Sequence, residues 1–375
     1  MSVAAMGEQR EQTERDASAN RIWWFAFGYF ACYAPYSAMT KAVTKGLVFP
    51  GHKADGFAIL PISVLASLVG MFAFLTIMGW WKYATHRRVF GVSVPTPTKW
   101  TAFSGLCTAM VIMTTTLAYT FTGVSIVFIM LLMRGGVLVI APITDAVAGR
   151  KVKWFSWVGL ALSIGALLVA ERGGDYKITA VCAVNVLIYL FSYFVRLRFM
   201  SRKAKSEDEN ANARYFVEEQ MVGTPALAIA LAVVALGGWG EIGRQLRIGF
   251  TDYWRSEFLL TILAIGFLSQ GTGIFGGLIL LDKRENTFCV PVNRTSSILA
   301  GVVASVGLAL IYKQHLPATA ELVGAALVVL AVLSLSIPPL IEKSRKAKAA
   351  AHERELNAAK ALPTNTPRDA EREPA

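Results

Sequence analysis

Two arginines, Arg134 and Arg294, lie deep inside apolar stretches of this sequence. Arg134 is about twelve residues into one stretch, a helical rise of about 18 Å, which places it near the centre of a bilayer. Arg294 is about nine residues into another. Each would cost about 2.5–3.5 kcal/mol if it faced lipid, so the two together would cost ~5–7 kcal/mol. We therefore expect both side chains to face protein, water or a ligand.

The chemistry that this pair predicts is anion binding. A guanidinium group is a planar fork that donates two parallel hydrogen bonds to a phosphate or a carboxylate. Two such groups that converge on a central cavity would hold an anionic solute. The sequence leaves one alternative open, in which each arginine is structural and is satisfied by backbone carbonyls or by a buried carboxylate.

Polar residues near the arginines extend the set of candidate substrate-binding residues. Asn293 and Ser297 flank Arg294, and Gln270 lies in the middle of another apolar stretch, where a buried amide needs partners. Tyr36 and Tyr189 belong to series of tyrosines at helical spacing. Core packing is the alternative for the tyrosines, and helix packing through small residues is the alternative for Ser297.

Three acidic residues border the apolar stretches. Glu219, next to Glu218, opens one of them. A proton-coupled role, a pairing with an arginine and an interfacial position all stay open for Glu219, which we include in the candidate set. Asp145 follows Arg134 by eleven residues and returns to nearly the same face of a helix. It is a candidate for gating entry, with an ordinary interfacial acid as the alternative.

The sequence predicts no enzyme active site, metal site or bound cofactor. The four cysteines fall inside apolar stretches and the four histidines are scattered over loops and one tail, so neither a disulfide framework nor a metal-ligand spacing is present. The run from Gly271 to Gly276 matches the dinucleotide-binding fingerprint, which requires a strand before it and a helix after it. Because this run lies within an apolar stretch, we interpret it as helix packing or a local helix break.

These side chains must be positioned by helices that cross a membrane. Of the 375 residues, 54% are apolar and 17% are charged, and the mean hydropathy is +0.49. The charges lie between apolar blocks of about twenty residues, the length of one crossing. We predict an all-α integral membrane protein with ten transmembrane helices, near residues 22–43, 57–80, 100–119, 122–146, 154–171, 178–197, 215–238, 256–281, 286–312 and 318–341.

The basic residues predict the orientation. Ten crossings leave both termini on one side, which carries 25 of the 37 lysines and arginines against 9 on the other. The positive-inside rule therefore predicts cytoplasmic termini, in a bacterial inner membrane or in a eukaryotic cell or organelle membrane. Residues 1–21 and 342–375 are predicted tails, the latter basic, helical over 342–361 and disordered beyond. Phospholipid head groups account for the basic charge, and we expect no nucleic-acid partner.

The two halves of the chain repeat one pattern. In the first half, an arginine in an apolar stretch, Arg134, is followed by the polar link 149–151 and then by a glycine-bearing stretch. In the second half the same order is found for Arg294, the polar link 312–314 and a second glycine-bearing stretch. Five helices per half is an odd number, so consecutive halves enter the membrane from opposite sides. We therefore predict two five-helix repeats of inverted topology, over 22–172 and 178–341, a plan typical of transporters.

A resemblance to a known family is carried by residues 118–165. Four segments follow one another in this region: the stretch from Ala118 to Ser125, the motif Met130-Leu131-Leu132-Met133-Arg134-Gly135-Gly136, the link Gly149-Arg150-Lys151, and Trp157-Val158-Gly159. Together they resemble the helix-four to helix-five signature of the drug/metabolite transporter superfamily, in particular its EamA-like and nucleotide-sugar-transporter-like solute carriers. The resemblance implies a 5+5 inverted repeat that carries solutes by alternating access. The chain departs from the commoner exporter members, which have Glu where Arg150 follows the link glycine.

The predicted function is secondary transport of a small anionic metabolite by alternating access. One alternative is an exporter of amines or amino-acid-like solutes, with the two arginines paired to Glu219 and Asp145. Another is a membrane scaffold or membrane-embedded enzyme, for which we would expect His, Asp or Ser clustered at one membrane face. The expected partners are a small-molecule solute and the lipid bilayer, and a homodimer stays open.

Overall fold

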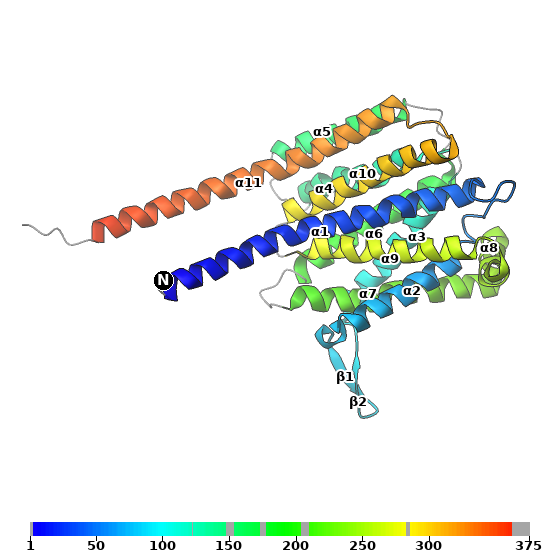
Figure 1. Cartoon of the computed structure of the whole chain (residues 1–375), viewed down its shortest axis with the longest axis horizontal. Coiled ribbons are helices and arrows are strands. Elements are labelled where there is room, and N and C mark those ends of the chain that lie inside the picture. The colour runs from blue at the N-terminus through cyan, green and yellow to red at the C-terminus, as the bar shows by residue number, and fades with distance from the viewer. Residues whose placement is uncertain are drawn as a thin grey trace, which may run out of the picture.

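The computed structural model describes residues 3–121, 123–147, 154–172, 178–203, 210–282 and 286–361. These residues form a bundle of long helices with one small sheet at its side (Figure 1). The long helices are α1 (Val3–Lys45), α2 (Leu60–Ile77), α3 (Lys99–Thr120), α4 (Ile126–Val147), α5 (Trp154–Glu171), α6 (Ala180–Lys203), α7 (Ala211–Gly237), α9 (Leu259–Leu281), α10 (Asn286–Tyr312) and α11 (Thr319–Ala361). The short elements are η1 (Trp80–Tyr83), β1 (His86–Val89), β2 (Val92–Pro95), α8 (Gly240–Phe250) and η2 (Asp252–Arg255).

Each apolar stretch of the sequence folds as one long helix. The boundary between the third and fourth stretches is the least obvious in the sequence, because both sides of it are apolar. There α3 ends at Thr120 and α4 begins at Ile126, and Gly123 has a φ of +79°. Only glycine adopts this left-handed conformation without steric strain, so the chain reverses within a few residues.

Six of these helices are long and apolar enough to cross a membrane: Leu60–Ile77, Lys99–Thr120, Ala180–Met200, Ala211–Gly237, Leu259–Leu281 and Val292–Tyr312. Shorter apolar helices cover Ile126–Val139, Trp157–Glu171 and Thr319–Ser334. Large apolar side chains such as Phe191, Leu236 and Leu260 are mainly exposed on the bundle surface, as expected where lipid replaces water as the solvent. The chain is therefore a predominantly α-helical membrane protein.

The helices pack in pairs from the two ends of the chain. The first helix α1 contacts α9 and α10, α3 contacts α6 and α7, and α5 contacts α11 along its length. The bundle therefore interleaves the two predicted halves and does not set them side by side. Both α1 and α11 extend past the bundle at the same end, whereas α8 lies at the opposite end (Figure 1).

Three features differ from the sequence-based expectations. The predicted tail 1–21 is, from Val3, the first part of α1, and 342–361 is a helical continuation of α11 with no break between span and tail. The strands β1 and β2 form an antiparallel hairpin between α2 and α3, which an all-α prediction omits. A short amphipathic helix, α8, joins α7 to α9. Residues 362–375, predicted to be disordered, lie outside the described residues.

Candidate functional site

Arg134 and Arg294 meet around one tyrosine hydroxyl inside the bundle. Arg134, on α4, is 4% exposed; its Nη1 donates to the Tyr189 hydroxyl on α6, and its Nη2 donates to the Tyr33 hydroxyl on α1 at 2.5 Å. Arg294, on α10, is 0% exposed, and its Nη1 donates to the same Tyr189 hydroxyl at 3.3 Å. Helices from both predicted halves therefore bring the two cations to a shared acceptor.

Aromatic rings supply the other contacts of these two arginines. The Arg134 Cζ lies 5.4 Å from the centre of the Tyr33 ring and 5.2 Å from that of Tyr189, and the Arg294 Cζ lies 4.0 Å from that of Tyr193. A ring face stabilises a cation through its quadrupole but carries no net charge. Among the described residues, no carboxylate lies within 4.0 Å of either guanidinium group. The Nε and Nη2 atoms of Arg294 have no hydrogen-bond partner there.

A third buried arginine, Arg196 on α6, is neutralised by a carboxylate. Its Nε donates to the Glu219 Oε1 at 2.9 Å and its Nη2 donates to the Oε2 at 2.7 Å. Ser104 also donates to the Glu219 Oε1, at 2.6 Å. This bidentate pair carries no net charge, so the positive charge of the cluster belongs to Arg134 and Arg294.

These contacts decide one of the alternatives for Glu219. It pairs with an arginine, but the partner is Arg196 and not Arg134 or Arg294. Glu219 is 0% exposed between α3, α6 and α7, and its position relative to a membrane interface stays a prediction. Asp145, the other acid that could pair with these arginines or gate entry, has its side chain outside the described part of the structure.

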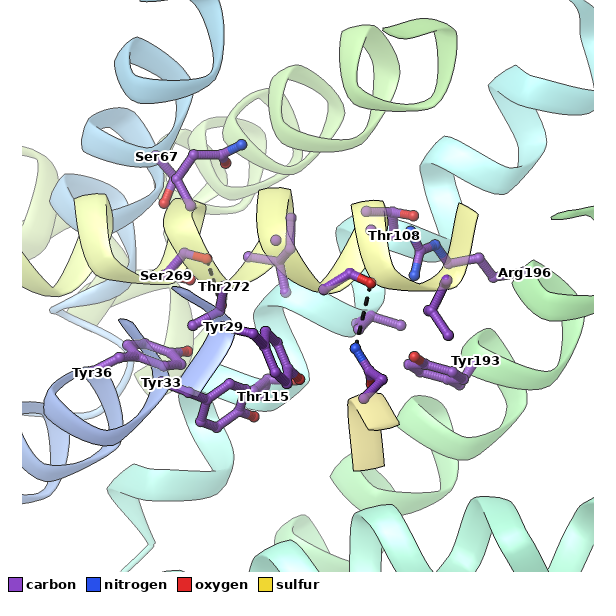
Figure 2. A pocket seen from close by; sticks show the side chains of 18 of the residues that line it. Tyr29, Tyr33, Tyr36, Ser67, Thr108, Thr115, Tyr193, Arg196, Ser269 and Thr272 are labelled. Carbon is purple, nitrogen blue, oxygen red and sulfur yellow. Dashed lines mark hydrogen bonds between the residues drawn. The ribbon is translucent and has the colours of Figure 1, made fainter. Parts of the chain in front are cut away.

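A cavity of about 80 Å³ lies next to the arginine cluster, lined by residues of eight helices. In Figure 2, Tyr33 and Tyr36 lie at one end of the view and Tyr193 and Arg196 at the other, with α9 running between them. The polar lining residues are Tyr29, Tyr33, Tyr36, Ser67, Thr108, Thr115, Arg134, Tyr193, Arg196, Gln220, Ser269, Gln270, Thr272 and Asn293. Ordinary ligand pockets measure about 300–1,000 Å³, so this cavity is smaller than a typical ligand site.

The eight candidate residues divide into two sets. Four of them line the cavity: Arg134, Asn293, Gln270 and Tyr36. The other four, Arg294, Tyr189, Ser297 and Glu219, lie behind the lining. The Tyr189 hydroxyl joins the two arginines, and the Ser297 hydroxyl donates to the Arg294 carbonyl within α10 at 2.8 Å. The second set therefore supports the wall that the first set forms.

Several buried polar atoms in the cavity wall have no partner among the described residues. They are the Gln270 Nε2, the Gln220 Oε1, the Asn293 Oδ1 and the Thr108 Oγ1. A buried polar group without a hydrogen bond is destabilising by about 1–3 kcal/mol. Water or a bound solute would satisfy these donors and acceptors, so the wall next to the cations is equipped to bind an uncharged polar group as well.

The sequence analysis did not include Arg196 or Gln220 among the candidate site residues. Tyr193 was also left out of that set, although it belongs to the second series of tyrosines at helical spacing. A signal for Arg196 was present in the spacing. Tyr29, Tyr33 and Tyr36 are four and three residues apart, and Tyr189, Tyr193 and Arg196 have the same spacing. Both series present one face of a helix, and all of their members except Tyr189 line the cavity. Gln220 had no comparable signal, because its role depends on how α7 packs.

Glu218, which the sequence places at the border of an apolar stretch, is buried outside the cavity and joins two segments of the chain by hydrogen bonds. It is 0% exposed and its two oxygens accept hydrogen bonds from Thr85, Thr98 and Thr101. These threonines lie at the base of the β1–β2 hairpin and in the first turn of α3. Glu218 therefore fixes the connection between α2 and α3.

Among the described residues, the arrangement places two cations and several unpartnered polar atoms beside one cavity, which is the chemistry of an anion-binding site. In the described part of the chain, no three His, Cys, Asp or Glu side chains are grouped to hold a metal ion. No protein-family model matches the sequence, and a search of curated proteins finds no match either. The function has to be argued from the site.

Proposed function

We propose that this chain is a secondary transporter that binds a small anionic metabolite between two halves of its bundle and moves it by alternating access. The observation that carries the proposal is the pair Arg134 and Arg294. Both are buried, both donate to Tyr189, and hydroxyls and rings are their partners among the described residues. Two buried positive charges with no carboxylate in contact among the described residues favour an anion strongly.

The pattern of helix contacts supports ten spans in a 5+5 inverted repeat. In this proposal α1 to α5 correspond to α6, α7, α9, α10 and α11. If each helix is replaced by its counterpart in the other half, every one of these contacts predicts a second contact. The α1–α9 contact predicts α3–α6, the α2–α9 contact predicts α3–α7, and the α1–α10 contact predicts α4–α6. All three predicted contacts are present. The contacts α2–α7, α4–α10 and α5–α11 join corresponding helices. This exchange is what a pseudo-twofold axis produces.

The inverted repeat that these helix contacts support is also the plan of the drug/metabolite transporter superfamily, which residues 118–165 resemble. Both observations support membership of that superfamily. In this proposal the basic side of the bundle, where α1 and α11 extend beyond it, is cytoplasmic. The cavity has to enlarge to load a metabolite, since about 80 Å³ is small for one. In this proposal the structure is a state of the transport cycle in which the binding cavity has not enlarged to admit a metabolite.

The charge of the site argues against the amine exporter. In that alternative, carboxylates on Arg134 and Arg294 would neutralise them and leave the cavity free for a cation. Glu219 is held by Arg196 instead, so the described cavity wall is positive. A cationic solute would be repelled by both arginines, because burial weakens the screening of their charges.

The proposal is tested by solute binding to the purified protein. We expect glycerol 3-phosphate or succinate to raise the melting temperature and putrescine to leave it unchanged. Arg134→Leu should stay folded and lose the shift. A charge-assisted hydrogen bond contributes about 1.5–3 kcal/mol, so affinity should fall by roughly 10–150-fold.

The matched variant Arg134→Lys keeps the charge and loses the fork. It should retain a weaker shift, between those of wild type and Arg134→Leu. Uptake of the stabilising anion into proteoliposomes then distinguishes transport from binding. Stabilisation by putrescine alone, or an anion shift that survives in Arg134→Leu, would contradict the proposal.

A further inference from the structure

The hairpin of β1 and β2 projects from the side of the bundle and has two different faces (Figure 1). Arg87 pairs with Val94, and Arg88 pairs with Ser93. Cross-strand partners lie on the same face of a sheet, and neighbours along a strand lie on opposite faces. Val92 and Val94 therefore share one face with Arg87, and Ser93 and Arg88 share the other.

The turn of the hairpin contains Phe90 in a backbone conformation that a phenylalanine does not favour. Phe90 has a φ of +50° and Gly91 a φ of +82°, the two positive values of a type I′ turn, which usually contains Asn-Gly. A bulky side chain strains this conformation. The Phe90 side chain is also 103% exposed, so it packs on nothing else in the described chain. A strained and unpacked aromatic residue indicates a partner outside the chain.

The surroundings of Phe90 define the chemistry of that partner. Val92 is 64% exposed and Val94 is 38% exposed, next to the exposed basic residues Arg87 and Arg88. The connection 81–99 also contains Lys82 and Lys99 and no acidic residue. An apolar tip with purely basic flanks matches the boundary between acyl chains and anionic head groups.

The hairpin is held rigidly where that boundary would lie. It joins the ends of α2 and α3, two of the apolar helices, and Trp100 at the start of α3 is 53% exposed, as interfacial tryptophans are. At the hairpin base, Thr96 donates its amide to the Thr85 carbonyl at 2.7 Å, and Thr85 donates to the buried Glu218. In Figure 1 the hairpin points away across the helix direction, as an element lying along a membrane surface would.

We propose that this hairpin is a lipid-binding element that docks on the surface of the membrane its own chain spans. Phe90, Val92 and Val94 enter the interfacial layer, and Arg87 and Arg88 bind the head groups of anionic phospholipids. Arginine side chains are long enough to reach the head groups from either face of the hairpin. The proposal goes beyond transport and does not depend on it.

The experiment compares two adjacent positions on opposite faces of the hairpin. Val94→Cys and Ser93→Cys are each labelled with an environment-sensitive fluorophore in the full chain, reconstituted into phosphatidylcholine vesicles with or without phosphatidylglycerol. The labelled wild-type chain gives the background from its own cysteines, of which Cys32 is only half-buried. We expect nitroxide-labelled lipid to quench the label at 94 several-fold more than that at 93, with a larger difference when phosphatidylglycerol is present.

Substitutions in the hairpin test the roles of Phe90 and the arginines. Phe90→Asn keeps the turn, because Asn tolerates a positive φ, and it should decrease the quenching at 94 without lowering the melting temperature. Lys313→Asn is the matched control, since Lys313 is the other described non-glycine residue with a positive φ and lies far from the hairpin in sequence. Arg87→Gln with Arg88→Gln should remove the dependence on phosphatidylglycerol.

Three results would overturn the proposal. Equal quenching at 93 and 94 would show that neither face is selected. Quenching at 94 that is unchanged in Phe90→Asn would show that the tip does not insert. Quenching that is the same with and without phosphatidylglycerol would refute the assignment to anionic lipid. None of these results bears on solute binding, so the two proposals fail separately.

Discussion

At the scale of single residues, the three buried arginines of the bundle have different electrostatic partners. Arg196 shares its charge with Glu219 through two hydrogen bonds, whereas Arg134 and Arg294 contact tyrosine hydroxyls and rings. Removing one member of a buried ion pair leaves the other charge uncompensated, whereas removing an unpaired cation relieves a desolvation penalty. The same type of substitution should therefore have opposite consequences at Arg196 and at Arg134.

We expect Arg196→Leu to destabilise the fold by about 3–5 kcal/mol, because it leaves the Glu219 carboxylate buried and unpaired. Arg134→Leu should leave the melting temperature close to that of wild type. Thermal melts of the purified variants give the comparison. The double variant Arg196→Leu with Glu219→Gln should recover most of the lost stability, and a double variant as unstable as Arg196→Leu alone would contradict the ion-pair explanation.

The sequence could identify Arg134 and Arg294 because an arginine in an apolar stretch is costly wherever the helix packs. Their mutual position around Tyr189 depends on how α1, α4, α6 and α10 meet, which no local pattern contains. A pairing of Glu219 with an arginine was among the alternatives, but Arg196 as its partner was missed for the same reason. Both residues lie near helix ends in the sequence, and only the contacts among α3, α6 and α7 bury them.

At the scale of secondary-structure elements, Glu218 connects the α2–α3 hairpin to α7. Its carboxylate accepts the amides of Thr85 and Thr98 at 3.0 Å and the hydroxyls of Thr85 and Thr101 at 2.7 Å. A carboxylate with this many donors stabilises two chain segments at once. The position of the hairpin therefore follows from one buried side chain of a neighbouring helix.

Glu218→Ala should release the hairpin base, because it leaves four donors without their acceptor. We expect faster tryptic cleavage after Arg87 and Arg88 in the folded protein. Glu241→Ala is the control, since Glu241 is an exposed acid on α8 whose hydrogen bonds to Arg244 and Gln245 lie within its own helix. Cleavage at the hairpin that is equally fast in both variants, or unchanged in Glu218→Ala, would exclude this role of Glu218.

The helices were predictable and the small elements were not, for a physical reason. An apolar stretch of about twenty residues in a membrane protein has few structures other than a helix that satisfy its backbone. Residues 86–95 are too short and too basic to give such a signal, and their strands pair only because Phe90 and Gly91 adopt positive φ values. The helix α8 was missed because its sequence GEIGRQLRIGF mixes charged and apolar residues, so it has no apolar run.

At the scale of the whole molecule, two cavities lie along α1 with a hydrogen-bonded layer of side chains between them. The central cavity touches Tyr29, Tyr33 and Tyr36, and a second cavity of about 320 Å³ touches Lys41 and Lys45. Between them the Tyr33 hydroxyl is hydrogen-bonded to Tyr119, and that of Tyr36 to Thr116, both at 2.7 Å. In the proposed orientation this layer separates the central site from the external side.

Lys41 lies at the end of this layer that is external in the proposed orientation. It is 3% exposed, and its Nζ donates to the Phe121 carbonyl and, at 2.8 Å, to the Val124 carbonyl. These carbonyls belong to the turn between α3 and α4, so one lysine of α1 holds the turn of two other helices. In the proposed transport cycle, opening the external side would require these hydrogen bonds to break.

Replacement of Lys41 should therefore shift the protein towards an externally open state. Cys182, near the start of α6 that is external in the proposed orientation, is 2% exposed and is a free thiol. In Lys41→Gln we expect a membrane-impermeant maleimide, added outside sealed proteoliposomes, to label Cys182 several-fold faster than in wild type. Lys45→Gln is the matched control, since Lys45 lines the same outer cavity and is exposed.

The double variant Lys41→Gln with Cys182→Ala should lose the added labelling, because the reactive thiol is absent. A folded Lys41→Gln protein that is labelled at the wild-type rate would contradict a gate at this layer.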